Sequence, residues 1–276
     1  HKILSGRKNF DELRQLGGIS GFPKTRESAC DAFNTGHSST SISAGLGMAQ
    51  ARDLKGEDYH VVSIIGDGAL TGGMAYEALN NAAMLDSNFI IVLNDNNMSI
   101  SENVGGMSRY LGGLRTSEGY NDLKKSVTSV LEKIPVAGPR MIDKISRTKQ
   151  GIKQLLIPGM LFENMGITYL GPVDGHDLNQ LCRVLKEAKK VDHAVLVHVR
   201  TQKGKGYRPA EKNPERFHGV DPFDVETGKP RQEKIYPSYT DVFSRELCRL
   251  AKKDERIVAI TAAMPDGTGL KRFRRE

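Results

Sequence analysis

The sequence is poor in cysteine, and its few cysteines are not arranged for a disulfide framework or a zinc ion. Cys30, Cys182 and Cys248 are odd in number and far apart, and no C-x-x-C pair occurs. Disulfide scaffolds and structural zinc sites need paired or closely spaced cysteines. Neither is expected here, and a reducing, cytoplasmic compartment is the predicted location.

Long apolar runs and long blocks of one charge are also missing. No apolar run approaches the roughly 18 residues of a membrane-spanning helix, and no signal peptide is recognisable. The net charge is +7, but lysine and arginine occur in short clusters along the whole chain. We therefore expect neither a membrane nor a nucleic acid as partner, and only a modest attraction for phosphorylated or carboxylate substrates.

Three common phosphate and cation motifs are absent as well. No G-x-x-x-x-G-K-[ST] occurs, a Rossmann pattern would need glycine at Thr71, and an EF-hand loop would need glycine at Ile100. The chain also lacks an initiator methionine and begins abruptly at His1. It stops at Glu276, soon after a strand-like run. We expect it to be a piece of a longer protein.

Two short apolar runs, residues 61–65 and 89–93, dominate what the sequence does contain. Both are rich in β-branched residues, as buried parallel strands are. Each ends in an abrupt change to polar residues, at Asp67 and at Asn94-Asp95-Asn96. Ligands of open α/β sheets lie outside the carboxyl ends of such strands, so the two strand ends predict one shared site.

The residue types at these two strand ends suit Mg²⁺, which prefers hard oxygen ligands and shares its coordination sphere with water and phosphate. Asp67 offers a carboxylate, Asn96 an amide oxygen, and the bend at Met98 a backbone carbonyl. Gly66 and Gly68 allow a tight turn and close approach of a ligand. The helix expected next would favour a diphosphate at its N-terminus. The alternative is a surface turn at Asp67 and a polar loop at Asn96.

A second anion site is predicted at Gly36-His37-Ser38, which precede a helical pattern of apolar residues beginning at Ile42. Residues 38–41 would then occupy a helix N-terminus, where hydroxyls and open N–H groups bind anions. The spacing alone equally allows these serines merely to cap the helix, with His37 on the surface.

Four segments together resemble one family: GHSSTSISAGLGMA, GDGALTGGMAYEALN, NDNNMSISENVG and GPVDGHD. They are similar to 1-deoxy-D-xylulose-5-phosphate synthases, relatives of transketolase, and Asp67 and Asn96 stand 29 positions apart, as in the thiamine-diphosphate motif. Transketolases usually have a GPLGQG-like loop where this chain has GHSSTS. The resemblance implies condensation of pyruvate with D-glyceraldehyde 3-phosphate, with loss of CO₂, as the first step of non-mevalonate isoprenoid synthesis and a source for thiamine and pyridoxal synthesis.

The resemblance also implies cofactors and residue roles. Thiamine diphosphate and Mg²⁺ are the expected cofactors, with the metal held by Asp67, Asn96 and Met98. The expected cofactor-binding residues are Gly36, His37, Ser38, Gly68, Ala69, Asn96 and Tyr207. The tyrosine belongs to a KGxGYxPAE pattern, and its alternative role is packing on Pro209. No catalytic residue is assigned, because the family's glutamate and substrate histidines lie outside this chain, which by itself should be inactive.

The expected fold is α/β, with a doubly wound, mostly parallel sheet. Residues 1–208 would form the diphosphate-binding domain with a variable insertion at about 101–160, residues 209–237 a linker, and residues 238–276 the start of a pyrimidine-binding domain. Besides the two strands above, we expect strands at 166–173, 194–199 and 256–261 and helices at 70–85, 178–190 and 240–252.

Family resemblance further implies a homodimer. Two other functions stay open from the sequence. One is another transketolase-type thiamine-diphosphate enzyme with a different acceptor, and the other is a non-catalytic module that binds Mg²⁺ and a diphosphate.

Overall fold

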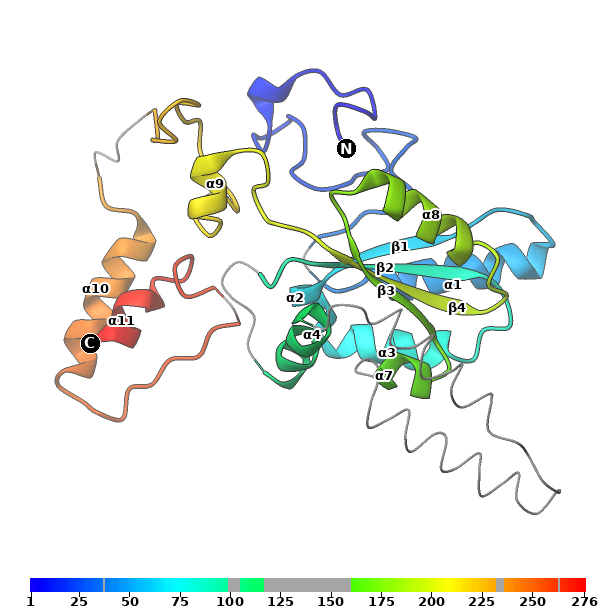
Figure 1. Ribbon diagram of the computed structural model, residues 1–276. Coiled ribbons are helices and arrows are strands. Elements are labelled where there is room, and N and C mark those ends of the chain that lie inside the picture. Colours follow the sequence, from blue (N-terminus) through cyan, green and yellow to red (C-terminus); the bar gives the residue numbers. More distant parts are fainter. Residues whose placement is uncertain (37, 99–104, 117–159, 232–235, 263) are drawn as a thin grey trace, which may run out of the picture. The chain divides into compact units, whose positions relative to one another are not determined.

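The computed structural model describes residues 1–36, 38–98, 105–116, 160–231, 236–262 and 264–276. Its centre is a four-stranded sheet in the order β1-β2-β4-β3, in which every neighbouring pair is parallel (Figure 1). The strands are β1 (Val62–Gly66), β2 (Phe89–Asp95), β3 (Thr168–Asp174) and β4 (Ala194–Arg200). The predicted α/β fold and its four parallel strands are confirmed.

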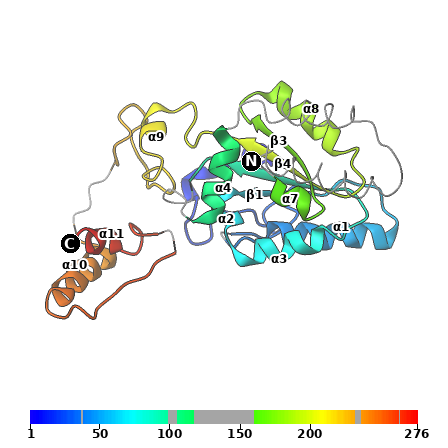
Figure 2. The same cartoon turned by 60° about the horizontal axis from the view of Figure 1, so that its bottom comes forward.

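Helices cover both faces of this sheet, which makes it doubly wound. Figure 2 shows α1 (Ser41–Lys55) and α3 (Gly73–Ala82) on one side and α8 (Leu178–Ala188) on the other. The α1 side buries the larger core, including Phe89, Ile91 and Leu196, and the α8 side a smaller one around Val195 and Val197. Both faces of β2 and β4 are buried because these central strands are apolar along nearly their whole length.

Strand β1 is less protected than the central strands. Val62 and Ile64 are 49% and 66% exposed, and the register places them beside Ile90 and Val92 of β2, on the face that α8 covers farther along the sheet. Within the described residues no strand pairs with the outer edge of β1.

Glycine allows α1 to lie unusually close to the sheet. A Cβ added at Gly45 would stand 2.0 Å from Ser63 Oγ and 2.9 Å from the Phe89 ring. Ser63 Oγ also donates a hydrogen bond of 2.7 Å to the carbonyl of Ser41, the first residue of α1. The start of this helix is therefore held directly against β1.

The opposite ends of the strands are tied together by Arg52 and Asn88. The buried Arg52 guanidinium donates to the carbonyls of Tyr59 and Asn88 at 3.1 and 2.9 Å and to Ser87 Oγ at 2.9 Å. The Asn88 amide in turn donates to the carbonyls of Ala188 and Val191, at the end of α8. Polar groups buried there are thus satisfied by one continuous set of hydrogen bonds.

The backbone divides into two compact units, His1–Asp95 with Val104–Thr201 and Asn96–Asn103 with Gln202–Glu276, which we call the first and second unit. The first also holds the 3₁₀ helix η1 (Phe10–Glu12) and the short helices α2 (Asp67–Leu70), α4 (Gly106–Thr116) and α7 (Met160–Asn164). The second holds α9 (Arg208–Lys212), α10 (Tyr239–Ala251) and α11 (Leu270–Arg275). The domain boundaries expected from the sequence stay a prediction, and the insertion at 101–160 lies mostly outside the described residues.

Two predicted elements differ in the structure. The helix expected at 70–85 is shorter in the structure and forms as α3 (Gly73–Ala82). Leu70 is instead the last residue of α2, and Gly72 adopts an extended conformation as the N-cap of α3. The strand expected at 256–261 does not form: the segment pairs with no other strand among the described residues, and Ile260 is 96% exposed. An apolar run becomes a strand only where a partner can complete its hydrogen bonds. By contrast, the helix expected at 240–252 is present as α10, capped by Ser238 and Asp241.

Among the described residues, no helix is both long enough and apolar enough to cross a membrane.

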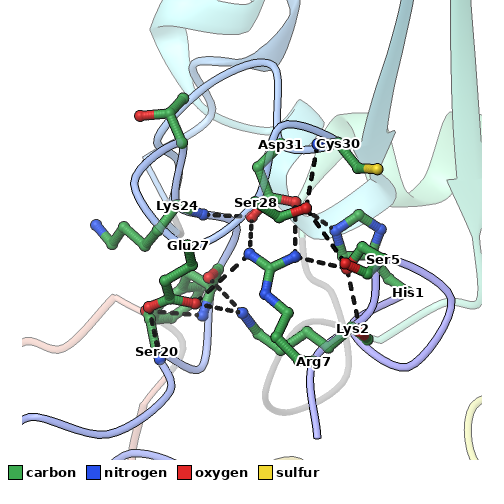
Figure 3. A network of polar contacts seen from close by, with 12 residues as sticks. His1, Lys2, Ser5, Arg7, Ser20, Lys24, Glu27, Ser28, Cys30 and Asp31 are labelled. Atoms are coloured by element: carbon green, nitrogen blue, oxygen red, sulfur yellow. Dashed lines mark hydrogen bonds and ion pairs between the residues drawn. The ribbon is translucent and has the colours of Figure 1, made fainter.

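The N-terminal 36 residues are irregular, and a network of charged side chains holds them together (Figure 3). Asp31, whose side chain is fully buried, binds the Arg7 guanidinium, His1 Nε2 at 2.8 Å and the Lys24 amide at 2.6 Å. Glu27 accepts from the Ser20 amide at 2.9 Å. These contacts give the segment an ionic rather than an apolar core.

The network makes this segment sensitive to acid. The hydrogen bond from Arg7 lowers the pKa of Asp31, and the hydrogen bond from the Ser20 amide lowers the pKa of Glu27. Because folding lowers both values, the stabilisation is complete above their ordinary pKa of about 4 and is lost as the pH falls through the lowered ones. We expect amide exchange in residues 1–36, corrected for intrinsic rates, to accelerate between about pH 5 and pH 3. Asp31→Asn should exchange fast throughout this range, and equal protection at both pH values would contradict the prediction.

Gly45 and Gly47 of α1 form a matched pair for testing the close packing of the helix. Gly45→Ala should destabilise the protein by about 2 kcal/mol, because its methyl group overlaps Ser63 and Phe89. Gly47→Ala should be neutral or stabilising by up to about 1 kcal/mol, because a Cβ there meets nothing within 4 Å and alanine favours helix. Urea unfolding midpoints measure both, and equal effects of the two substitutions would refute the packing argument.

Candidate functional site

The carboxyl end of β1 carries the predicted metal ligand. Asp67 directly follows β1 as the first residue of α2, and it is only 1% exposed. Strand register pairs Gly66 with Asn94, so Asp67 leaves the sheet beside the end of β2. Gly68 and Ala69 continue the turn, where the Thr71 hydroxyl donates to the Gly68 carbonyl at 2.7 Å. The structure thus places Asp67, Gly68 and Ala69 at the edge of the sheet where the sequence predicted a site.

The loop that follows β2 begins with a tight turn. Asn96 Oδ1 accepts a hydrogen bond of 3.0 Å from the Met98 amide, and Asn97 adopts a left-handed conformation with φ of 62°. Asn96 and Met98 belong to the second unit, although Asn96 is bonded directly to Asp95 of the first. That these residues share a metal ion with Asp67 stays a prediction.

The N-terminus of α1 is open in the way an anion site requires. Helix α1 begins at Ser41, and the side chain of its N-cap, Thr40, makes no capping hydrogen bond. Thr40 therefore does not cap the helix through its side chain, and N–H groups of the first turn are left without an intrahelical partner. Ser38 and Gly36 precede this turn and are exposed, whereas His37 lies outside the described residues.

Two helix N-termini approach each other at this point. A Cβ added at Gly72, the N-cap of α3, would stand 2.7 Å from Ser39 Oγ. Ser39 itself has a left-handed backbone, with φ of 59°. The strain of such a conformation is tolerated where the surroundings enforce it, and it is commonest at functional sites. The positive ends of α1 and α3 are thus brought together, which favours a negatively charged ligand.

The donor set fits Mg²⁺ better than zinc. Among the residues that the structure describes, no three His, Cys, Asp or Glu side chains gather closely enough to hold a metal ion. A buried carboxylate is costly to desolvate, and a hard cation that shares its sphere with water and phosphate would offset that cost at Asp67. Asp67 would thus supply one carboxylate to such a cation, and that the site holds Mg²⁺ stays a prediction.

Tyr207 has a structural role of its own within the second unit. Its ring contacts Phe217 and Phe223, with centroids 5.6 and 6.0 Å away, and its hydroxyl donates to the Val225 carbonyl at 2.8 Å. The aromatic partners of Tyr207 are thus two phenylalanine rings, and its packing on Pro209 stays a prediction. The expected contact with a cofactor stays a prediction.

One polar cluster near the strand ends escaped the sequence reasoning. Asp95, His198 and Tyr169, from β2, β4 and β3, are joined by hydrogen bonds and are each at most 1% exposed. The sequence feature that could have indicated this cluster is His198, an ionisable residue inside the otherwise apolar run of β4. Buried histidines need partners, so this position was a candidate for a polar network.

Comparison with known proteins identifies the family of this chain. Residues 1–201 match the family model described as 1-deoxy-D-xylulose-5-phosphate synthase. The chain is 58% identical over 274 residues to a 1-deoxy-D-xylulose-5-phosphate synthase of Lachnoclostridium phytofermentans, covering 99% of this chain and 44% of that protein. It is 58% identical over 277 residues to the synthase of Desulforudis audaxviator, covering 100% of this chain and 43% of that protein. The chain thus spans less than half the length of these curated relatives.

A solved structure supports the fold. The transketolase of Campylobacter jejuni aligns with 98% of this chain and 34% of its own, with a TM-score of 0.52 and 20% sequence identity. At that identity the likeness concerns the α/β architecture alone. Together with the match over residues 1–201 and the identity to curated relatives, the chain belongs to the 1-deoxy-D-xylulose-5-phosphate synthase family.

Proposed function

We propose that this chain is the diphosphate- and metal-binding part of a transferase that condenses pyruvate with D-glyceraldehyde 3-phosphate. The products are CO₂ and 1-deoxy-D-xylulose 5-phosphate, and the cofactors are thiamine diphosphate and Mg²⁺. The observation that carries the proposal is a buried carboxylate, Asp67, at the end of a parallel strand in a unit where two helix N-termini also meet. Membership of the synthase family supports the choice of substrates.

The residues of this chain would bind and orient the cofactor. Asp67 would bind Mg²⁺ through its carboxylate, with Asn96 and the Met98 carbonyl as further oxygen ligands. Gly36, Ser38 and the N-terminus of α1 would hold the diphosphate, since open N–H groups and a helix dipole favour phosphate oxygens. When bound, thiamine diphosphate supplies the nucleophilic carbon that adds to the pyruvate carbonyl and accepts the electron pair released with CO₂.

The remaining predicted contacts complete this arrangement. Gly68 and Ala69 would border the diphosphate from the turn after β1, and His37 and Tyr207 would contact the cofactor from their own loops. No group of this chain is assigned a proton transfer. As family resemblance implies, we propose a homodimer as the working assembly.

Asp67→Asn tests the metal site with a minimal change of shape. In the full-length protein we expect the Mg²⁺-dependent affinity for thiamine diphosphate to fall more than about 100-fold, beyond the loss typical of an outer-shell partner. Isothermal titration calorimetry at fixed Mg²⁺ measures the affinity. Asp86→Asn is the matched control, because Asp86 is exposed and precedes β2 at the opposite end of the strands. Unchanged affinity of the Asp67 variant would refute the site.

A further inference from the structure

A line of three buried polar side chains crosses the sheet just before the predicted metal loop. Tyr169 Oη lies 2.6 Å from His198 Nδ1, and His198 Nε2 lies 2.9 Å from Asp95 Oδ2. The histidine and aspartate side chains are completely buried. Strand order β2-β4-β3 places the three residues on adjacent strands (Figure 1).

The tautomer of His198 determines the direction of these hydrogen bonds, and an ionised Asp95 selects one tautomer. An ionised carboxylate can only accept, so His198 Nε2 donates to Asp95. In the neutral imidazole Nδ1 is then an acceptor, and the Tyr169 hydroxyl donates to it. In this arrangement the Tyr169 hydroxyl bonds to Nδ1 and thereby favours the His198 tautomer that carries its proton on Nε2, facing Asp95.

Other contacts hold the end of β2 from the same side. Thr201, immediately after β4, donates through its hydroxyl to Asn94 Oδ1 at 2.6 Å and through its amide to the Asp95 carbonyl at 2.9 Å. His198 adds the bond to the Asp95 carboxylate. Both the backbone and the side chain of Asp95 are thus held by β4, one residue before Asn96.

Aromatic rings hold the far end of this line in place. Tyr169 stacks on Phe162 of α7 with centroids 6.1 Å apart and planes at 5°. Phe162 meets the edge of Tyr110 from α4 at 6.2 Å. The Tyr110 hydroxyl accepts from the Leu161 amide at 3.2 Å, and burial raises its pKa to about 12. The position of Tyr169 is therefore determined by packing, which leaves its hydroxyl little freedom.

Stability alone does not explain such a line of groups. Buried polar and charged groups are expensive to desolvate, and apolar side chains of similar volume are often at least as stabilising. A requirement for geometry does explain it, because Mg²⁺ demands near-ideal octahedral ligands and the proposed ligand Asn96 is bonded directly to Asp95. Outer-shell hydrogen bonds commonly orient metal ligands in this way.

We propose that His198, held by Tyr169, is a positioning residue for the Mg²⁺ of this enzyme. It acts through Asp95 to set the end of β2, from which Asn96 and Met98 leave to supply their oxygens. The inference rests on the proposed function, because it assumes that those two residues ligate the metal.

Three substitutions in the full-length protein test this role. Tyr169→Phe keeps the stacked ring and removes only the hydroxyl. His198→Leu removes the bond to Asp95, whereas His198→Gln keeps an amide donor near the place of Nε2. His193→Gln is the matched control, because His193 precedes the other end of β4 and bonds to Thr168 and Asp192.

We expect Mg²⁺ affinity, measured by calorimetry in the presence of thiamine diphosphate, to fall on the order of tenfold for Tyr169→Phe and more for His198→Leu. His198→Gln should recover most of the loss, and the control should match the wild type. Ca²⁺ tolerates irregular coordination, so its affinity should fall less than that of Mg²⁺. A merely structural role would lower the melting temperature of the metal-free protein without changing this selectivity.

The two proposals fail in different ways. If the wild-type protein binds thiamine diphosphate with no dependence on Mg²⁺, the proposed function itself is wrong. If the wild type binds both but Tyr169→Phe and His198→Leu bind Mg²⁺ as tightly as the control, the positioning role of His198 is overturned. If His198→Leu fails to fold, the Mg²⁺ affinity of Tyr169→Phe relative to that of the control still tests the positioning role.

Discussion

Strand β2 is paired in parallel with β1 on one edge and with β4 on the other, and this double pairing determines where the polar residues at the ends of these strands can lie. The register sets Gly66 beside Asn94 and Asp95 beside Arg200, so the backbone leaves the sheet at the same edge after β1, β2 and β4. Because parallel strands all present their carboxyl ends together, a polar residue at each end converges without any special loop. The close fit of α1 at Gly45 then brings a helix N-terminus to the same edge.

Much of this arrangement could be predicted from the residues alone. The short, β-branched apolar runs of β1, β2 and β4 are typical of parallel strands, and the change to polar residues at Asp67 marks the end of β1. The interruption of the helix at Gly72 could not be predicted in the same way. Small residues continue on both sides of it, and the close approach of Ser39 to Gly72 comes from another part of the chain.

Tertiary partners explain the other differences. The apolar segment at 256–261 has strand-like residues but no neighbour to pair with among the described residues, and periodicity cannot show whether a neighbour exists. The network of Tyr169, His198 and Asp95 depends on which strands are adjacent, since its members are up to 103 positions apart. Tyr207 shows a third limit of prediction from sequence. The motif that contains it predicts a contact with the cofactor, but it gives no sign of the contacts that Tyr207 makes with Phe217 and the Val225 carbonyl.

The exposed side of β1 has a practical consequence for handling the protein. Val62 and Ile64 present adjacent apolar surface on a strand whose outer edge is unpaired among the described residues. Unprotected edge strands of this kind recruit strands from other molecules. The exposed apolar side chains and the unpaired edge together would therefore make β1 a surface that favours association with a strand of another molecule.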